Sequence, residues 1–111
     1  MSEVNTLEKQ LADSKTLIER RETALRLANN PDFRRLVLEE FCVQECARYA
    51  QASADPALSP IDQANSLAIA QSAGHLRRFL SVVVQMGNTA ERDLVPLEEA
   101  LEEARREEGN Q

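Results

Sequence analysis

Residues 29–52 read NNPDFRRLVLEEFCVQECARYAQA, and this stretch decides the fold. Asn30 can cap a helix, Pro31 suits the first helical position, where no N–H donor is needed, and Asp32 complements the positive end of the helix dipole. The pattern therefore predicts a helix over residues 31–52. Its apolar residues cover far more than one stripe, which is typical of a helix that contacts neighbours on several sides.

The preceding residues 3–29 predict a long N-terminal helix. Its apolar stripe is interrupted at Ser14 and Arg21, where the repeat calls for apolar residues, so it indicates a coiled-coil-like segment too weak to stand alone. A helix of this length spans about 40 Å, more than the width of a compact domain of this size, and part of it should project or find a partner. The stripe consists of Val4, Leu7, Leu11, Ile18 and Leu25.

The clearest loop lies between residues 53 and 60, because Asp55-Pro56 and Ser59-Pro60 push each residue before a proline away from the α region. Ser59 can then cap a further helix, which the pattern extends over residues 60–86. Within that helix, Phe79 is expected to be a core residue, as Phe41 is in the preceding helix, because a large aromatic side chain gains most from burial.

Gly87-Asn88 predicts the end of that helix, because both residue types accept the left-handed conformation of a helix C-terminus. Thr89 can cap a fourth helix over residues 90–108, kinked near Pro96. Together these segments predict an all-α fold, a helical hairpin or bundle of about four helices with a long N-terminal coiled-coil-like helix. At 111 residues we expect a single domain, 1–111.

The residues with potential chemistry are few. Cys42 and Cys46 lie within the broad apolar surface of one helix and are poorly spaced for a disulfide with each other, so we predict buried, reduced and metal-free core thiols. A zinc site would add His75, the sole histidine, and Glu39 or Glu45, but this spacing does not match zinc-binding patterns. We predict no metal, no cofactor, no catalytic residue and hence no enzyme.

The formal net charge is −6, and most of the acidity lies after residue 88. Such a chain lacks the basic face that would neutralise phosphates, which argues against nucleic acid or an anionic membrane as the main partner. The pairs Arg20-Arg21 and Arg34-Arg35 alternate with acidic residues and are interpreted as solvated helix surface. Neither a signal pattern nor a membrane-spanning apolar run is present, so we expect a soluble cytoplasmic protein without its own export signal.

Two narrow apolar rows on heavily charged helices predict a protein–protein interface. The alternative is that these two helices simply pack on each other and on the hairpin, which would give a closed monomeric four-helix bundle. The predicted interface residues are Leu7, Leu11 and Ile18 on the first helix and Leu94, Leu97 and Leu101 on the last.

The chain also resembles a group of short helical proteins that tailed bacteriophages encode near their head and packaging genes. The resemblance rests on RRETALRL (20–27), NPDF (30–33) and LVLEEF (36–41), and it continues through ECAR (45–48), ADP (54–56) and GNTAE (87–91). It covers most of the chain and implies a virion or head-assembly context, without implying any activity.

Together, these observations favour a non-enzymatic phage structural or assembly protein, such as a capsid-associated, scaffold-like or head–tail junction component. Its partners would be other copies of the chain, phage head proteins or both, in the host cytoplasm or the virion. One alternative is a small acidic inhibitor or adaptor whose Glu-rich last helix mimics a negatively charged ligand of a host enzyme. Another is a packaging or regulatory DNA-binding protein, which the charge disfavours.

Overall fold

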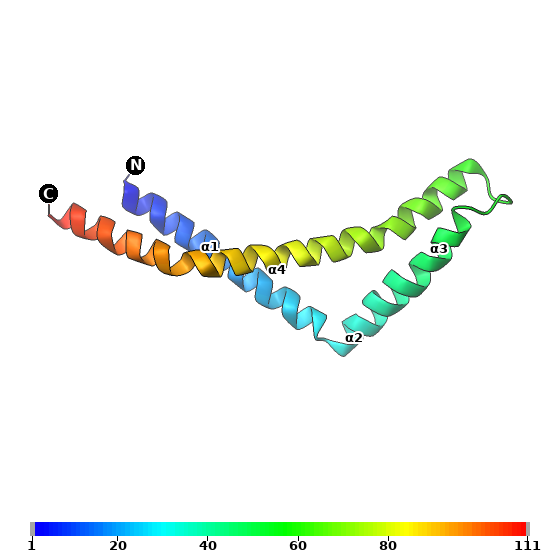
Figure 1. The fold of residues 1–111 in the computed structure, drawn as a ribbon, viewed down its shortest axis with the longest axis horizontal. Helices are drawn as coiled ribbons and strands as arrows, with labels where there is room; N and C mark the ends of the chain where they lie inside the picture. Colours follow the sequence, from blue (N-terminus) through cyan, green and yellow to red (C-terminus); the bar gives the residue numbers. More distant parts are fainter. Residues whose placement is uncertain (1, 111) are drawn as a thin grey trace. The chain divides into compact units, whose positions relative to one another are not determined.

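A computed structural model describes residues 2–110 as helices joined by short connections, with no strand among them (Figure 1). The helices are α1 (Glu3–Ala28), α2 (Pro31–Phe33), η1 (Arg34–Glu45), α3 (Cys46–Ala52) and α4 (Pro60–Gly109). Because α2, η1 and α3 follow one another without a break, the described residues form three continuous helical segments. The prediction of an all-α fold with a long N-terminal helix is confirmed.

Local capping places the helix starts where the sequence predicts them. The side-chain oxygen of Asn30 accepts hydrogen bonds from the backbone N–H groups of Asp32, at 2.9 Å, and Phe33, at 3.0 Å. The Ser59 hydroxyl accepts one from the backbone N–H of Asp62 at 3.1 Å. Each cap satisfies donors that have no partner within the helix, which explains why both boundaries could be recognised from short motifs.

The predicted break at residues 87–89 is wrong. α4 runs through Gly87 and Pro96 without interruption, so the expected helices 60–86 and 90–108 are one helix, and the chain has three helical segments instead of about four. No glycine among the described residues has a positive φ. Gly87 instead allows α4 to approach α1 closely, since a Cβ atom added there would lie 2.3 Å from the Cβ of Arg21 on α1.

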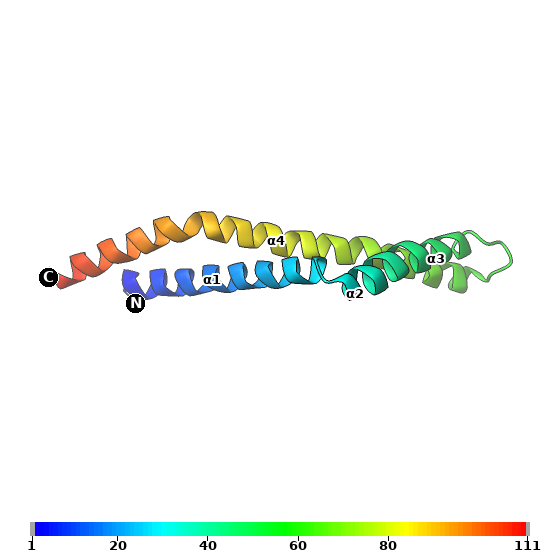
Figure 2. The same cartoon turned by 90° about the horizontal axis from the view of Figure 1, so that it is seen from below.

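The helices group into two compact units, a terminal unit formed by residues 2–24 and 82–110 and a hairpin unit formed by residues 25–81. In the terminal unit, α1 lies antiparallel beside the C-terminal part of α4 (Figure 2). Its core contains Val4, Leu101 and Ala104, with Leu7 and Leu11 packed against them. The expectation of one domain over 1–111 stays a prediction.

Small side chains allow α1 and α4 to approach closely in the terminal unit. Ala24, Gly87 and Ala90 are all buried there. The predicted stripe of α1 passes through Leu25, but the structure turns Ala24 inward and leaves Leu25 40% exposed. The smaller residue fits where the two backbones come close, and the larger one does not.

The hairpin unit joins α2, η1 and α3 to the start of α4 through residues 53–59. The side-chain amide of Gln63 donates to the backbone oxygen of Asp55 at 2.7 Å, which fastens the connection to α4. Further along, the sulfur of Cys46 lies 3.5 Å from the carbonyl oxygen of Ile69 and 4.0 Å from the Ser72 hydroxyl. From the connection, the two arms diverge toward α2 (Figure 1).

The first arm of the hairpin unit is π-helical over η1, which the sequence does not predict. The backbone N–H of Cys46 donates to the carbonyl oxygen of Phe41, five residues back, as in a π-helix. Residues four positions apart lie on the same side of a helix. Cys42 and Cys46 have this spacing, and both are buried as predicted.

The expectation that Phe41 and Phe79 are core residues is wrong. Phe41 is 37% exposed and Phe79 is 57% exposed. Within the hairpin unit, the buried residues are Cys42, Cys46 and Ser66, all of them small. The fully buried residues of the hairpin unit are therefore small, whereas several large apolar ones are exposed.

Gly87→Ala should destabilise the protein by ~1–3 kcal/mol, the usual cost of adding a methyl group to a packed contact, because the Arg21 Cβ is anchored to its own backbone and cannot swing away. Gly74→Ala is the matched control. No atom lies within 4 Å of a Cβ added at Gly74, so this change should raise stability by up to ~1 kcal/mol through helix propensity. Thermal denaturation followed by circular dichroism measures both, and a Gly87→Ala variant as stable as Gly74→Ala would contradict the close approach.

Candidate interaction surfaces

The six predicted interface residues lie in the terminal unit, and none of them is fully exposed. Leu101 is buried, with 5% of its surface accessible, and the other five are half-buried. Leu7 and Leu11 pack against the core that contains Leu101, so the structure brings these three together within one chain. This is the packing of the first and last helices on each other that the sequence left open as an alternative. Contact of the same rows with another chain stays a prediction.

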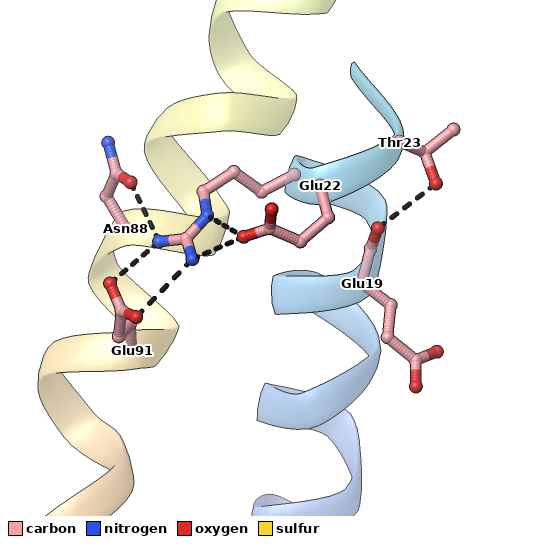
Figure 3. A network of polar contacts seen from close by, with 6 residues as sticks. Glu19, Glu22, Thr23, Asn88 and Glu91 are labelled. Atoms are coloured by element: carbon pink, nitrogen blue, oxygen red, sulfur yellow. Dashed lines mark hydrogen bonds and ion pairs between the residues drawn. The ribbon is translucent and has the colours of Figure 1, made fainter. Parts of the chain in front are cut away.

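Arg21, which interrupts the apolar stripe of α1, forms a polar clamp between α1 and α4 (Figure 3). One terminal nitrogen, Nη1, donates to Asn88 Oδ1 at 3.0 Å and to Glu91 Oε2 at 2.8 Å. The other, Nη2, donates to Glu22 Oε1 at 2.8 Å. Arg21 is only 8% exposed, so the interpretation of Arg20-Arg21 as solvated surface is wrong for Arg21.

The contact between Arg21 and Glu91 shifts the pKa of each side chain in the direction that favours its charged form. The hydrogen bonds that Arg21 donates to Glu91 and, to a smaller extent, to Glu22 raise the pKa of Arg21 above its already high ordinary value, so the guanidinium stays charged. The hydrogen bond from Arg21 lowers the pKa of Glu91 below its ordinary value. With its donors engaged by three partners, Arg21 positions α1 against α4.

The second interruption of the stripe, Ser14, borders an open depression in the terminal unit. The depression has a volume of about 490 Å³. Its two carboxylates, Asp13 and Asp93, are solvent-exposed. The depression is lined by Gln10, Asp13, Ser14, Asp93, Pro96 and Leu97.

The residues considered for metal binding are not assembled into a site. Cys42 and Cys46 are buried free thiols, and His75 is exposed on α4. Among residues 2–110, no three or more His, Cys, Asp or Glu side chains are grouped so that they could hold a metal ion. Cys46 instead contacts Ile69 and Ser72, which is a packing role.

The hairpin unit leaves an unusual amount of apolar side-chain surface in contact with water. Fully burying one Val, Leu, Ile or Phe side chain is worth ~1.5–3 kcal/mol, and the net stability of a whole domain is only ~5–15 kcal/mol. Leaving several such side chains exposed therefore forgoes a free energy of burial that is large compared with the stability of a domain. Clusters of exposed apolar side chains mark binding surfaces. The large apolar residues that are at least 36% exposed in this unit are Leu25, Leu27, Leu36, Phe41, Val43, Ile61, Leu67, Ile69 and Phe79.

Four of the exposed residues on α4 share one side of the helix, here called the outer stripe: Ile61, Ala68, His75 and Phe79. Ile61 and Phe79 are 18 residues apart, which corresponds to about five full turns, and Ala68 lies two turns after Ile61. Ile61 is 74% exposed and Phe79 57% exposed. Phe79 is the member of this row that the sequence predicts to be a core residue, because helical spacing identifies an apolar face without showing what covers it.

The chain matches no protein-family model, no curated protein and no solved structure. None of the helices in the described part of the chain is long and apolar enough to cross a membrane. The function of its surfaces is therefore inferred from their geometry and chemistry.

Glu91→Gln should reduce the acid sensitivity of the fold. The folded-state pKa of Glu91 lies below its ordinary value, so its contribution is present at higher pH and is lost as pH falls through the folded-state pKa, that is, below about pH 4.5. The variant lacks this contribution at every pH, so its unfolding midpoint should fall less steeply there than that of the wild type. Glu98→Gln, which removes the same charge from an exposed site of α4, is the control. Identical pH profiles for the two variants, measured by urea denaturation, would contradict the clamp.

Proposed function

We propose that this chain is a non-enzymatic structural or assembly protein of a tailed bacteriophage, a capsid-associated, scaffold-like or head–tail junction component that acts through contacts between helices. The observation that carries the proposal is the exposed apolar surface of the hairpin unit. Leu36 at 63% and Val43 at 56% exposure protrude from its first arm, and the outer stripe lies on its second arm. A surface of this kind gains free energy only when another chain covers it.

The burial of the thiols and the pairing of the most strongly perturbed charged group support a binding role over a catalytic one. The two thiols are buried, and the most strongly perturbed charged group, Arg21, is engaged by Glu22, Asn88 and Glu91. Perturbed groups mark active sites when they face a cleft, whereas an ion pair between two helices perturbs them for structural reasons. These polar side chains thus hold the helices of the chain together.

The phage context of the proposal comes from the resemblance described above, which places such chains beside head and packaging genes. Its partners would be further copies of the chain, phage head proteins or both, encountered in the host cytoplasm or the virion. The segment GNTAE (87–91) of that resemblance contains three residues of the contact between α1 and α4, namely Gly87, Asn88 and Glu91. The segment RRETALRL (20–27) supplies Arg21 on the other side.

A second candidate is a small acidic inhibitor or adaptor of a host enzyme, and one observation favours it. The glutamates near the end of α4 form an exposed acidic surface, and the neighbouring Arg105 and Arg106 are paired with Glu8 and Glu103. This surface could mimic an anionic ligand. The same negative charge counts against the packaging or regulatory DNA-binding alternative. The acidic residues are Glu98, Glu99, Glu102, Glu103, Glu107 and Glu108.

Mass spectrometry of purified heads and of head precursors, from the phage that encodes this chain, tests the proposal. We expect many copies per particle in one or both preparations. Val43→Glu should lower the number of incorporated copies by about tenfold, because a charge in the contact costs at least ~1.4 kcal/mol. Val95→Glu, at 58% exposure in the terminal unit, is a matched control that should leave incorporation unchanged.

Absence of the chain from both heads and precursors would contradict the proposal. The acidic-inhibitor alternative would gain support if the chain instead bound one host enzyme with saturable affinity, and if Glu102→Gln with Glu103→Gln weakened that complex.

A further inference from the structure

We propose that residues 87–89 are a latent break in α4, and that the polar clamp around Arg21 keeps the helix continuous. Released from the clamp, α4 would divide into two helices, one ending near residue 86 and one beginning near residue 90. This inference goes beyond the proposed function, because it assigns the chain a second conformation that needs no partner.

The local sequence of residues 87–89 favours a helix boundary. Gly87 and Asn88 are the residue types that most readily adopt the left-handed conformation of a helix C-terminus, and Thr89 is a good N-cap residue. All three are poorer helix formers than alanine. In the structure α4 nevertheless continues through them, and the Thr89 hydroxyl accepts a hydrogen bond from Arg92 Nη2 at 3.2 Å.

Two other boundary motifs of the chain do begin helices. Asn30 and Ser59 each cap a helix with a side-chain oxygen that accepts backbone N–H groups. Gly74 also lies inside α4, but no N-cap residue follows it directly, so it is a poor helix former without a boundary motif. The continuity of α4 at residues 87–89 therefore needs a cause other than the local sequence.

The contact with Arg21 supplies that cause. Arg21 Nη1 donates to Asn88 Oδ1 at 3.0 Å and to Glu91 Oε2 at 2.8 Å (Figure 3). The stem of the same side chain lies against Gly87, where an added Cβ would be 2.9 Å from both the Cγ and the Cδ of Arg21. One side chain from α1 thus contacts two of the three residues of the latent break.

The clamp and the break exclude each other. Asn88 and Glu91 are three residues apart, so a continuous helix places both on the side that faces Arg21. If Thr89 capped a new helix instead, Asn88 would lie outside both helices and Glu91 would lie in the first turn of the second one. The guanidinium could then not reach both. Arg21 therefore binds the continuous form better than the broken form and shifts the equilibrium toward it.

Residue-resolved hydrogen–deuterium exchange of the full chain, measured by NMR, tests the inference. In a continuous α4 the N–H groups of residues 88–92 donate to carbonyl oxygens four positions earlier, and a break removes these partners. Arg21→Met keeps an unbranched stem but removes the donors, so exchange at residues 88–92 should rise at least about tenfold. Arg20→Met, at the exposed neighbouring position, is the matched control and should leave exchange unchanged. Residues 72–76, around Gly74, should exchange at the wild-type rate in both variants.

Replacing the boundary residues distinguishes a latent break from a general loosening. The variant that combines Arg21→Met with Asn88→Ala and Thr89→Ala still lacks the clamp but has better helix formers at both positions. Its exchange at residues 88–92 should return to within about threefold of the wild-type rate. Gly87 is kept in this variant, because an added Cβ would still meet the Cβ at position 21.

Glu91→Gln is a milder variant, because it leaves the other partners of Arg21 in place. It should raise exchange at residues 88–92 by about threefold, and it decides the question if Arg21→Met does not fold. Exchange there at the wild-type rate in Glu91→Gln would overturn the inference, as would a triple variant no better protected than Arg21→Met alone. An equal rise at residues 97–104 in Glu91→Gln would also overturn it, since the whole terminal unit would then be loosened.

Discussion

The position of α1 against α4 depends on the guanidinium group of Arg21. Its stem crosses Gly87, where no Cβ is tolerated, and its nitrogens reach Glu22, Asn88 and Glu91. An arginine that is 8% exposed must be paired, because an unpaired charge in such a place would be prohibitively costly. Apolar helix faces can slide along each other, whereas this pairing fits one register. The contact thus gives the terminal unit a specific arrangement that its few buried apolar residues could not specify alone.

The hairpin unit lacks such a contact and also lacks a sizeable core. Its fully buried residues are small, and several of its large apolar residues are exposed, Ile61 and Phe79 among them. Backbone ordering costs ~1–2 kcal/mol per residue, so a two-arm hairpin with little burial gains little to offset that cost. Under the proposed function, a partner chain that covers the exposed apolar side chains would add the burial that the unit lacks.

Local features of the fold were predictable from the sequence, and features set by distant contacts were not. The caps at Asn30 and Ser59 depend on the next few residues, so both helix starts were placed correctly. Gly87 has the local signature of a helix end, but its role is decided by Arg21, which lies 66 positions earlier. Phe79 was assigned to the core because periodicity identifies an apolar face without showing what covers it. The same limit applies to the predicted interface on the first and last helices: its apolar rows are half-buried or buried within one chain, and their contact with another chain stays a prediction.

The central claim is that other protein chains, further copies of this chain among them, cover the exposed apolar surface of the hairpin unit. Hydrogen–deuterium exchange of the wild type, measured at several protein concentrations, tests it most directly because exchange reports local stability segment by segment. The account predicts that protection of residues 61–79 rises as concentration increases through the association range, while protection of residues 97–104 in the terminal unit stays constant. Protection of residues 61–79 that is the same at every concentration would contradict it.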